Sequence, residues 1–388
     1  MRRIPAGLQG RFDRLIIVEI TKKIITKRLS KARELMAAED LDAYLLIGRA
    51  NKYYYSGFDH GVADDHTTSF VLLTKHESYF GLNKMDQTAA DEHCKCCRVI
   101  TTEGRSDGIG TLLGKIAKRT GIPKQIGYEQ YALKYNDFLG IEDHLPATKL
   151  IISEIADRQR TIKSDDEIAS IEAAMDIADQ VLDSVSAQIS EQLTEKEIAW
   201  MLESKARELG ADSLSFPAIV ATGRNSAKPH HVPTDKAIES GDFVMIDFGV
   251  SYEGYCSDTT RTYIMGGASA RHKKIYSAVL DALNESKEKA RAGMGAGELD
   301  EIARKVIEKH GFSDEFSHSL GHGLGLDIHE LPWVAPKEMA TLKEGMVFTI
   351  EPGVYVEGLG GVRIEDSVVL EKNGARSLTK LNRELICL

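Results

Sequence analysis

The sequence predicts an α+β protein of two domains, and three features of the chain carry this prediction. With 388 residues, the chain exceeds the size of one ordinary core. Its N-terminal part alternates short apolar runs with polar or helix-like segments, which is an α/β pattern. Its C-terminal part twice repeats an order of two helices followed by a strand-rich run. We therefore expect an α/β domain over residues 1–155 and a larger domain over residues 156–388.

Composition and charge exclude several classes of protein. The net charge is −10, and no block of Lys and Arg reaches the roughly five to eight residues typical of nucleic-acid binding. No stretch approaches the ~18 consecutive apolar residues of a membrane span. The early run "LIIV" is too short for a signal peptide. We therefore expect a cytoplasmic protein that binds neither nucleic acid nor membranes.

The first domain is predicted from short apolar runs between about residues 41 and 150. These runs are "AYLLIG", "SFVLL", "CRVITT", "QIGYEQ" and "TKLIIS". The segment "NKYYYSGF" (51–58) carries three tyrosines beside a turn signal, and we interpret it as packing in a core or an interface.

The cysteines predict no disulfide framework. Their number is five, and the cluster of Cys94, Cys96 and Cys97 lacks the paired C-x-x-C spacing and the second cluster of a structural zinc site. We interpret them as free thiols in a reducing compartment, with a soft-metal ligand set as the alternative. The sequence assigns the cluster no role.

Two capping boxes open the second domain. Ser164 stands three residues before Glu167, and Thr194 stands three before Glu197. Apolar residues follow each box at helical spacing, and Gly210 ends the second helix. Two further helices are predicted in "HKKIYSAVLDALNESKEKARAG" and "GELDEIARKVIEKHG" before the second strand-rich run. This order predicts an internal duplication whose sheets join around a shared cleft.

The first strand-rich run predicts a hairpin that brings two acids together. A turn at Glu253 and Gly254 places residue 249 opposite residue 258. Because side chains alternate along a strand, Asp247 then lies diagonally across from Asp258.

The second strand-rich run predicts another acidic pair. A loop centred on Leu359 places residue 353 opposite residue 365, so that Glu351 lies diagonal to Glu365. A bulge at "EPG" would shift this pairing by one. Four carboxylates facing one another would repel strongly without cations. With one neutral imidazole they would balance two divalent ions and leave a bridging hydroxide as nucleophile, so their joint placement favours a metal site over unrelated surface charges.

The imidazole has five candidates: His230, His231, His318, His322 and His329. His322 is favoured, because flanking glycines let the backbone approach a crowded centre. His322 and His329 lie seven residues apart and would face opposite ways on one extended strand, so we expect only one to bind metal. A solvent-facing or hydrogen-bonded ring fits His231 and His318 equally well.

Four blocks occur in this order along the second domain: "MIDFGVSYEGYCSDTTRT", "HSLGHGLGLDIHE", "TIEPGVYV" and "GVRIEDSVVL". Together they resemble the dinuclear metallopeptidases of the pita-bread fold, and the resemblance covers about residues 160–388. That family includes methionine aminopeptidase, aminopeptidase P, prolidase and the metal-free creatinase. The resemblance implies a pita-bread catalytic domain after a creatinase-like N-terminal domain. "NKYYYSGF" resembles the "N-x-Y-Y-L-T-G-F" segment of the Xaa-Pro branch.

The resemblance implies five metal ligands, which are Asp247, Asp258, His322, Glu351 and Glu365. Asp258 and Glu365 would each bridge two divalent ions per chain. We expect manganese, and cobalt, iron or zinc remain open, because such ligands accept all of them. A homodimer is also implied.

The activity implied is hydrolysis of the bond before proline in Xaa-Pro dipeptides, as in prolidases, or in short Xaa-Pro peptides, as in aminopeptidases. Glu351 would move a proton to the leaving nitrogen, while His230 and His329 stabilise the tetrahedral intermediate. Tyr355 and Arg363 stand where the family has groups that contact the ligands.

One position departs from the family pattern. Many prolidases resemble "H-E-x-P-R" where this chain has "HELPW", so Trp333 replaces an arginine suited to a dipeptide's carboxylate. Dipeptidase and aminopeptidase action both stay open, with Arg363 or a partner-chain residue as a replacement clamp. Other hypotheses are a lyase or non-peptidase hydrolase on the same fold and a binding protein without turnover. Such a lyase would carry an extra acid at the position of Gly249.

Overall fold

The computed structural model describes residues 21–59, 69–104 and 107–388. The run "LIIV" lies outside these residues. The described residues form two compact units, one ending at Gln159 and the other beginning at Arg160. This division falls within helix α6 (Ile155–Thr161), and the boundary predicted after residue 155 lies at the start of the same helix.

A six-stranded mixed sheet organises the first unit, in the order β4-β3-β2-β1-β5-β6. The strands are β1 (Ala43–Leu46), β2 (Ser69–Thr74), β3 (Ser78–Leu82), β4 (Arg98–Thr101), β5 (Gln125–Tyr128) and β6 (Lys149–Ile152). Each of the five predicted apolar runs contains strand residues, which confirms the α/β pattern. Strand β3 was not predicted; within it, Gly81 interrupts the apolar run and packs against the ring of Phe70.

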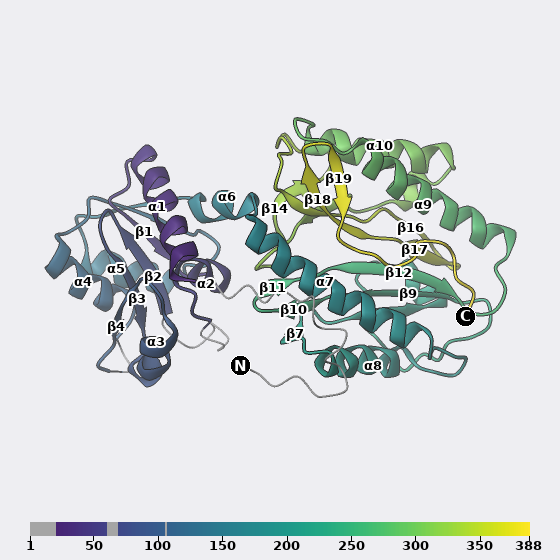
Figure 1. Ribbon diagram of the computed structural model, residues 1–388, viewed down its shortest axis with the longest axis horizontal. Helices are drawn as coiled ribbons and strands as arrows, with labels where there is room; N and C mark the ends of the chain where they lie inside the picture. The colour runs from purple at the N-terminus through teal and green to yellow at the C-terminus, as the bar shows by residue number, and fades with distance from the viewer. Residues whose placement is uncertain (1–20, 60–68, 105–106) are drawn as a thin grey trace. The chain divides into compact units, whose positions relative to one another are not determined.

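Among the residues that the structure describes, five helices and a short 3-10 turn, η1 (Lys84–Asp86), surround this sheet. The helices are α1 (Lys22–Ala38), α2 (Arg49–Ser56), α3 (Gln87–His93), α4 (Ile109–Thr120) and α5 (Tyr135–His144). In Figure 1, α4 and α5 lie on one side of the sheet and α1 on the other. The tyrosine segment forms α2, where Tyr54 and Tyr55 are buried, which confirms core packing.

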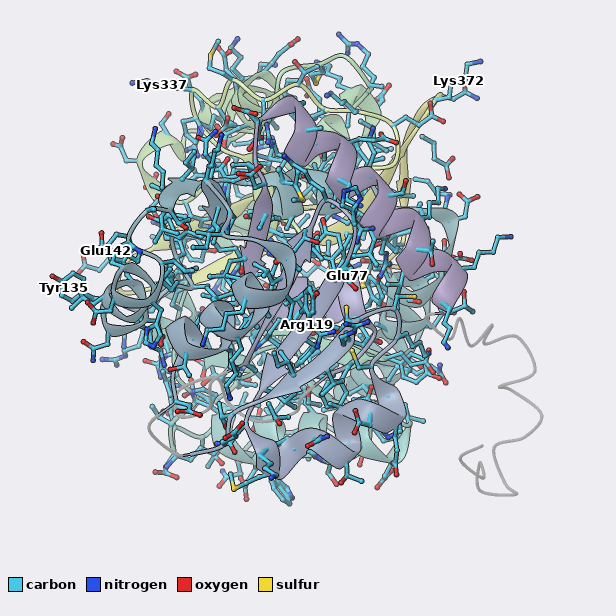
Figure 2. All side chains as sticks on the ribbon, turned by 90° about the vertical axis from the view of Figure 1, so that its left-hand side faces the viewer. Glu77, Arg119, Tyr135, Glu142, Lys337 and Lys372 are labelled. Carbon is cyan, nitrogen blue, oxygen red and sulfur yellow. The ribbon has the colours of Figure 1, made fainter. Side chains whose placement is uncertain are left out.

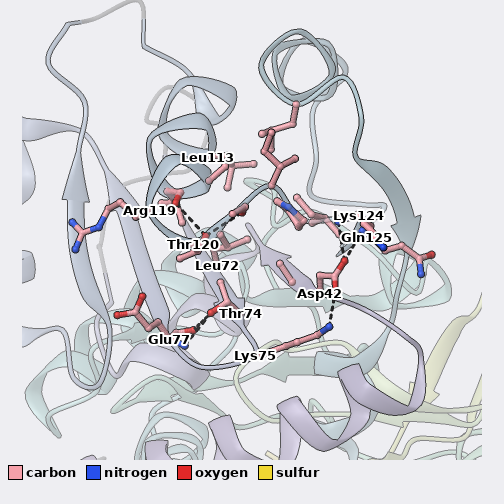
Figure 3. A pocket seen from close by; sticks show the side chains of 18 of the residues that line it. Asp42, Leu72, Thr74, Lys75, Glu77, Leu113, Arg119, Thr120, Lys124 and Gln125 are labelled. Atoms are coloured by element: carbon pink, nitrogen blue, oxygen red, sulfur yellow. Dashed lines mark hydrogen bonds and ion pairs between the residues drawn. The ribbon is translucent and has the colours of Figure 1, made fainter.

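A groove of about 730 Å³ lies beside the ends of β1 and β2 (Figure 3). Asp42 is its central charge: it pairs with Lys75 Nζ at 2.6 Å and accepts the backbone N–H groups of Lys124 and Gln125. The outer surface of α5 is exposed, and Figure 2 shows Tyr135 and Glu142 projecting from it. Among the charged groups labelled in the groove, Asp42 and Lys75 form an ion pair with each other.

The second unit begins with the predicted pair of helices. They are α7 (Asp165–Ser186) and α8 (Glu195–Glu208), and both start with complete capping boxes, on Ser164 and Thr194. The strands that follow are β7 (Ser213–Leu214), β8 (Ile219–Thr222), β9 (Phe243–Phe248), β10 (Val250–Tyr252), β11 (Tyr255–Cys256) and β12 (Thr259–Ile264). A 3-10 turn, η2 (Gly223–Ala227), follows β8.

The second half repeats this order. Helices α9 (Ala270–Lys289) and α10 (Ala296–Lys309) and turn η3 (Ser313–Glu315) come first. The strands are β13 (Gly321–Gly323), β14 (Glu330–Val334), β15 (Val347–Ile350), β16 (Gly353–Val356), β17 (Gly360–Arg363), β18 (Asp366–Glu371) and β19 (Gly374–Ser377). Figure 1 shows α7 and α8 covering the strands of the first half, and α9 and α10 covering those of the second. No helix of the described residues is long and apolar enough to cross a membrane.

The first hairpin has the predicted register. Glu253 and Gly254 both have positive φ, at 49° and 83°, and Tyr252 pairs with Tyr255 across them. The same register continues into the β9–β12 ladder, where Asp247 faces Thr260. Asp247 is therefore two positions along its strand from the residue opposite Asp258, as predicted.

The second hairpin differs from the prediction. Its loop is centred on Gly358 rather than Leu359, and Gly353 faces Arg363 rather than Glu365. The reason is local, because Gly358 adopts the left-handed conformation with φ 77°. The β15–β18 ladder keeps this register, so Glu351 is level with Glu365 instead of diagonal to it.

Hydrogen bonds join the two halves along a seam between β12 and the β17–β18 segment. Thr262 Oγ1 donates to the carbonyl of Arg363 at 2.9 Å, and Ser367 Oγ donates to the carbonyl of Asp258 at 3.0 Å. The backbone N–H of Glu365 donates to the carbonyl of Thr260 at 3.1 Å. The predicted shared cleft is thus built on strands that are bonded to each other.

Candidate metal centre

Three buried carboxylates meet where the two hairpins adjoin. Asp247 lies near the end of β9, Asp258 between β11 and β12, and Glu365 between β17 and β18. One oxygen from each lies within 4.8 Å of the others. Asp258 and Glu365 each occupy the break between two ladders of their hairpin. Within the described part of the chain, this is the only group of three or more such ligand types so close together.

His322 and Glu351 complete the cluster. His322 Nε2 lies 3.3 Å from Glu351 Oε1 and 3.6 Å from Asp258 Oδ2. Its other nitrogen, Nδ1, lies 3.1 Å from the carbonyl of Gly323, which assigns the proton to Nδ1. Nε2 therefore turns a lone pair toward the carboxylates, which is the orientation of a metal-ligating imidazole.

The glycines that flank His322 allow the strands to approach closely. A Cβ on Gly321 would lie 2.0 Å from the carbonyl oxygen of Thr349, and one on Gly323 would lie 2.2 Å from that of Leu331. This confirms that the glycines make room for a crowded centre. The hydroxyl of Thr349 also holds the neighbouring groups, because it donates to Glu351 Oε1 at 3.0 Å and accepts the N–H of His322.

The electrostatics of the cluster fit bound cations. Asp247 Oδ1 and Glu365 Oε1 are buried, and no described residue gives either of them a hydrogen bond. Burial, with the adjacent carboxylates, raises the pKa values of Asp258 and Glu365 well above their ordinary range. Burial likewise raises the pKa of Glu351 to about 7. Divalent cations would supply the missing partners and remove the repulsion.

Arg363 links two of the acids. Its Nη2 lies 2.5 Å from Asp247 Oδ2, and its Nε donates to Thr260 Oγ1 at 3.2 Å. Thr260 Oγ1 in turn donates to Glu365 Oε2 at 2.7 Å. Sequence reasoning missed Thr260, although the register prediction carried the signal, because that register places Thr260 opposite Asp247.

A second set of contacts runs from Arg363 through Tyr355 to His318. Arg363 Nη1 donates to the Tyr355 hydroxyl at 2.7 Å, and that hydroxyl lies 2.9 Å from His318 Nε2. His318 Nδ1 lies 2.8 Å from the carbonyl of Ser319. Burial lowers the pKa of His318 to about 3, and the positive charge of Arg363 is the second largest cause of this lowering. His318 is therefore a hydrogen-bonded, neutral ring behind Tyr355.

His329 lies beside His322, which corrects the expectation that they face opposite ways. The ring centroids are 4.3 Å apart. β13 ends at Gly323 and β14 begins at Glu330, so the chain reverses between the two histidines. Burial lowers the pKa of His329 to about 4. Trp333 stacks on His329 with centroids 6.2 Å apart and is 43% exposed.

His230 and His231 point to different surroundings. His230 is exposed, and the carbonyl of the preceding Pro229 accepts a hydrogen bond from Arg363 Nη1 at 3.4 Å. His231 is buried, with Nε2 2.8 Å from Glu195 Oε2. Of these two adjacent histidines, His230 is therefore the one near the cluster.

The chain matches two family models and several known proteins. The model of metallopeptidase family M24 matches residues 169–372, and that of the creatinase/prolidase N-terminal domain matches residues 28–162. An Xaa-Pro dipeptidase of Pyrococcus horikoshii is 37% identical over 368 residues, which cover 94% of this chain and 99% of the relative.

Solved structures agree with these matches. The Xaa-Pro dipeptidase from Bacillus anthracis has a TM-score of 0.87 and 34% identity, covering 94% of this chain and 100% of its own. The X-Pro aminopeptidase from Thermotoga maritima has a TM-score of 0.82 and 34% identity, covering 92% of this chain and 99% of its own.

Proposed function

The chain belongs to metallopeptidase family M24, and from this membership we propose that it hydrolyses the peptide bond before proline in Xaa-Pro dipeptides in a metal-dependent reaction. The observation that carries the proposal is the buried cluster of Asp247, Asp258 and Glu365 within a chain similar to Xaa-Pro dipeptidases over nearly its whole length. Along the chain, a creatinase-type domain comes first and a domain with the pita-bread fold of that family follows it.

Asp247, Asp258, His322, Glu351 and Glu365 would hold two divalent cations. When bound, such ions polarise a carbonyl group and lower the pKa of a water molecule. Manganese is our first proposal, because four carboxylates and one imidazole form a predominantly hard donor set that also accepts cobalt, iron or zinc. The two orphaned carboxylate oxygens support this ligand set.

The chain's own groups then account for substrate positioning and proton movement. Glu351 takes a proton from the attacking water and returns it to the proline nitrogen that leaves. His329 is neutral at pH 7, because its pKa is lowered to about 4, so it donates an N–H rather than a charge to the developing oxyanion. His230 would donate to the same oxygen. Arg363 and Tyr355 keep Asp247 oriented.

Trp333 bears on the length of the substrate. Its partly exposed ring, stacked on His329, offers an apolar face for proline at the position where the family pattern has an arginine. The proposal therefore includes short Xaa-Pro peptides beside dipeptides. The X-Pro aminopeptidase match supports this extension.

The test compares an Xaa-Pro dipeptide with an Xaa-Pro-Xaa tripeptide across manganese, cobalt, iron and zinc. Cleavage before proline in the metal-loaded protein, and its loss with chelator, is the expected result. Absence of cleavage of both peptides with every metal would overturn the proposal. Metal analysis that finds fewer than one divalent ion per chain would instead favour a binding protein without turnover.

Gly249 argues against the lyase alternative. A Cβ at this position would lie 1.8 Å from the carbonyl oxygen of Ser257, so no acidic side chain is accommodated there without movement of the backbone. The same proposal includes a cytoplasmic location, which the five free cysteines support. It also includes a homodimer, which light scattering tests.

A further inference from the structure

His230 lies between two residues whose positions are fixed. Before it, the carbonyl of Pro229 accepts from Arg363 at 3.4 Å. After it, the His231 ring is buried against Glu195. The exposed imidazole of His230 is therefore held in place through its two neighbours in the chain.

Glu195 is the hub of the second anchor. It is the first residue of α8, and its exposed fraction is 0%. Oε1 accepts from Thr222 N at 2.9 Å, Thr222 Oγ1 at 3.2 Å and Asn225 Nδ2 at 3.0 Å. Oε2 accepts from His231 Nε2 at 2.8 Å, Thr234 N at 2.9 Å and Thr234 Oγ1 at 2.6 Å. One carboxylate thus ties both ends and the middle of the segment 222–234.

The segment is also joined to the metal centre from the other side. Ser226 Oγ accepts the N–H of Gly361 at 2.8 Å, in β17. A Cβ on Gly361 would lie 2.3 Å from the carbonyl oxygen of Ser226, so the two backbones are in close contact. Movement of the segment would therefore move His230 relative to Arg363 and to Asp247, the carboxylate that Arg363 binds.

We infer that Glu195 is a positioning residue of this enzyme, which through His231 holds His230 at the metal centre. The inference rests on the proposed function, because His230 acts there on the substrate. A carboxylate is required, since all six groups that reach Glu195 are hydrogen-bond donors in this arrangement. An amide would direct its own N–H groups at some of them, and an aspartate would be one methylene too short.

The kinetic test uses the metal-loaded full chain and an Xaa-Pro dipeptide. We expect Glu195→Gln to lower kcat about 10- to 100-fold, with a change in KM below about threefold and unchanged metal content. The matched control is Glu197→Gln, an exposed capping-box residue in the same turn, which should retain kcat within about twofold. If Glu195→Gln does not fold, the pair His231→Gln and His231→Leu replaces it, because only the glutamine keeps a donor toward Glu195.

A double-mutant cycle separates positioning from general structural damage. When His230→Ala is already present, adding Glu195→Gln, or His231→Leu where that pair is used, should cost less than about threefold in kcat. Losses that multiply in full would overturn the inference and leave Glu195 as a structural residue.

A second readout does not depend on turnover. The ¹⁵N-labelled imidazole signal of His230, assigned by its loss in His230→Ala, should shift in Glu195→Gln or His231→Leu and stay in place in Glu197→Gln. An unchanged signal in the first variants would also overturn the inference. If the wild type cleaves neither peptide, the proposed function fails, while this measurement still decides whether Glu195 positions His230.

Discussion

Replacing Gly249 by alanine tests whether the break in the first hairpin sets the geometry of the metal centre. A Cβ there would lie 1.8 Å from the carbonyl oxygen of Ser257, and real contacts begin at 3.0 Å, so at least the missing 1.2 Å must come from backbone movement. Ser257 cannot yield easily, because its N–H donates to Val250 O at 2.9 Å and its Oγ accepts from Val250 N at 2.9 Å. The displacement would pass directly to Asp258, the next residue.

We expect Gly249→Ala to lower the free energy of unfolding by about 3 kcal/mol, the upper part of the range for overpacked sites. A displacement of roughly 1 Å at Asp258 should lower kcat/KM about 100-fold and weaken manganese binding. Urea unfolding and calorimetric manganese titration measure these effects. The matched control is Gly267→Ala, where a Cβ meets nothing within 4 Å. Gly249→Ala with unfolding within about 0.5 kcal/mol of wild type and unchanged manganese affinity would refute the reasoning.

Three other changes test charge and specificity. Burial raises the pKa of Asp179 to about 6, so its ionisation destabilises the fold as pH rises through 6. In urea unfolding, Asp179→Asn should therefore raise the free energy of unfolding by about 1–3 kcal/mol at pH 8 and change it little near pH 4. An equal gain at both pH values would contradict this. Because Asp258 and Glu365 have raised pKa values and must ionise to bind a cation, manganese should raise the unfolding temperature more at pH 8 than at pH 5.5. Thermal scans with manganese and with chelator measure this increase at each pH. An increase of equal size at both pH values would contradict the prediction. Trp333→Arg should raise the dipeptide-to-tripeptide ratio of kcat/KM about tenfold, because an arginine there can bind the carboxylate of a dipeptide. Trp200→Arg, at a site 69% exposed on α8, should leave this ratio unchanged. An unchanged ratio in Trp333→Arg would argue against such a clamp at this position.

Local signals in the sequence predicted the parts of the fold that depend on short-range hydrogen bonds. The capping boxes at Ser164 and Thr194 are complete in the structure, because each involves only residues three apart. The first hairpin was predictable to the residue, since a two-residue turn at Glu253 and Gly254 fixes a single register. The loop of the second hairpin offers several glycines, and composition alone did not identify Gly358 as its centre.

Contacts between distant segments were beyond the sequence reasoning. The adjacency of His322 and His329 depends on a chain reversal that residue spacing does not reveal. Glu195 looked like an ordinary helix residue, because its six donors lie 27 to 39 positions further along the chain. The roles of the predicted ligands remain predictions, although their meeting at one place followed from pairing each acid with its own hairpin.

The seam between β12 and the β17–β18 segment has a consequence for kinetics. Its hydrogen bonds use Thr262, Ser367 and the backbone of Glu365, so they join the strands that carry the proposed ligands in one half to those in the other. Neither half can separate from the other without breaking bonds beside Asp258 and Glu365. The two halves should therefore exchange amide hydrogens and unfold as a single cooperative unit. Release of a bound cation by local opening would then be slow, with a rate limited by the unfolding of the whole catalytic unit.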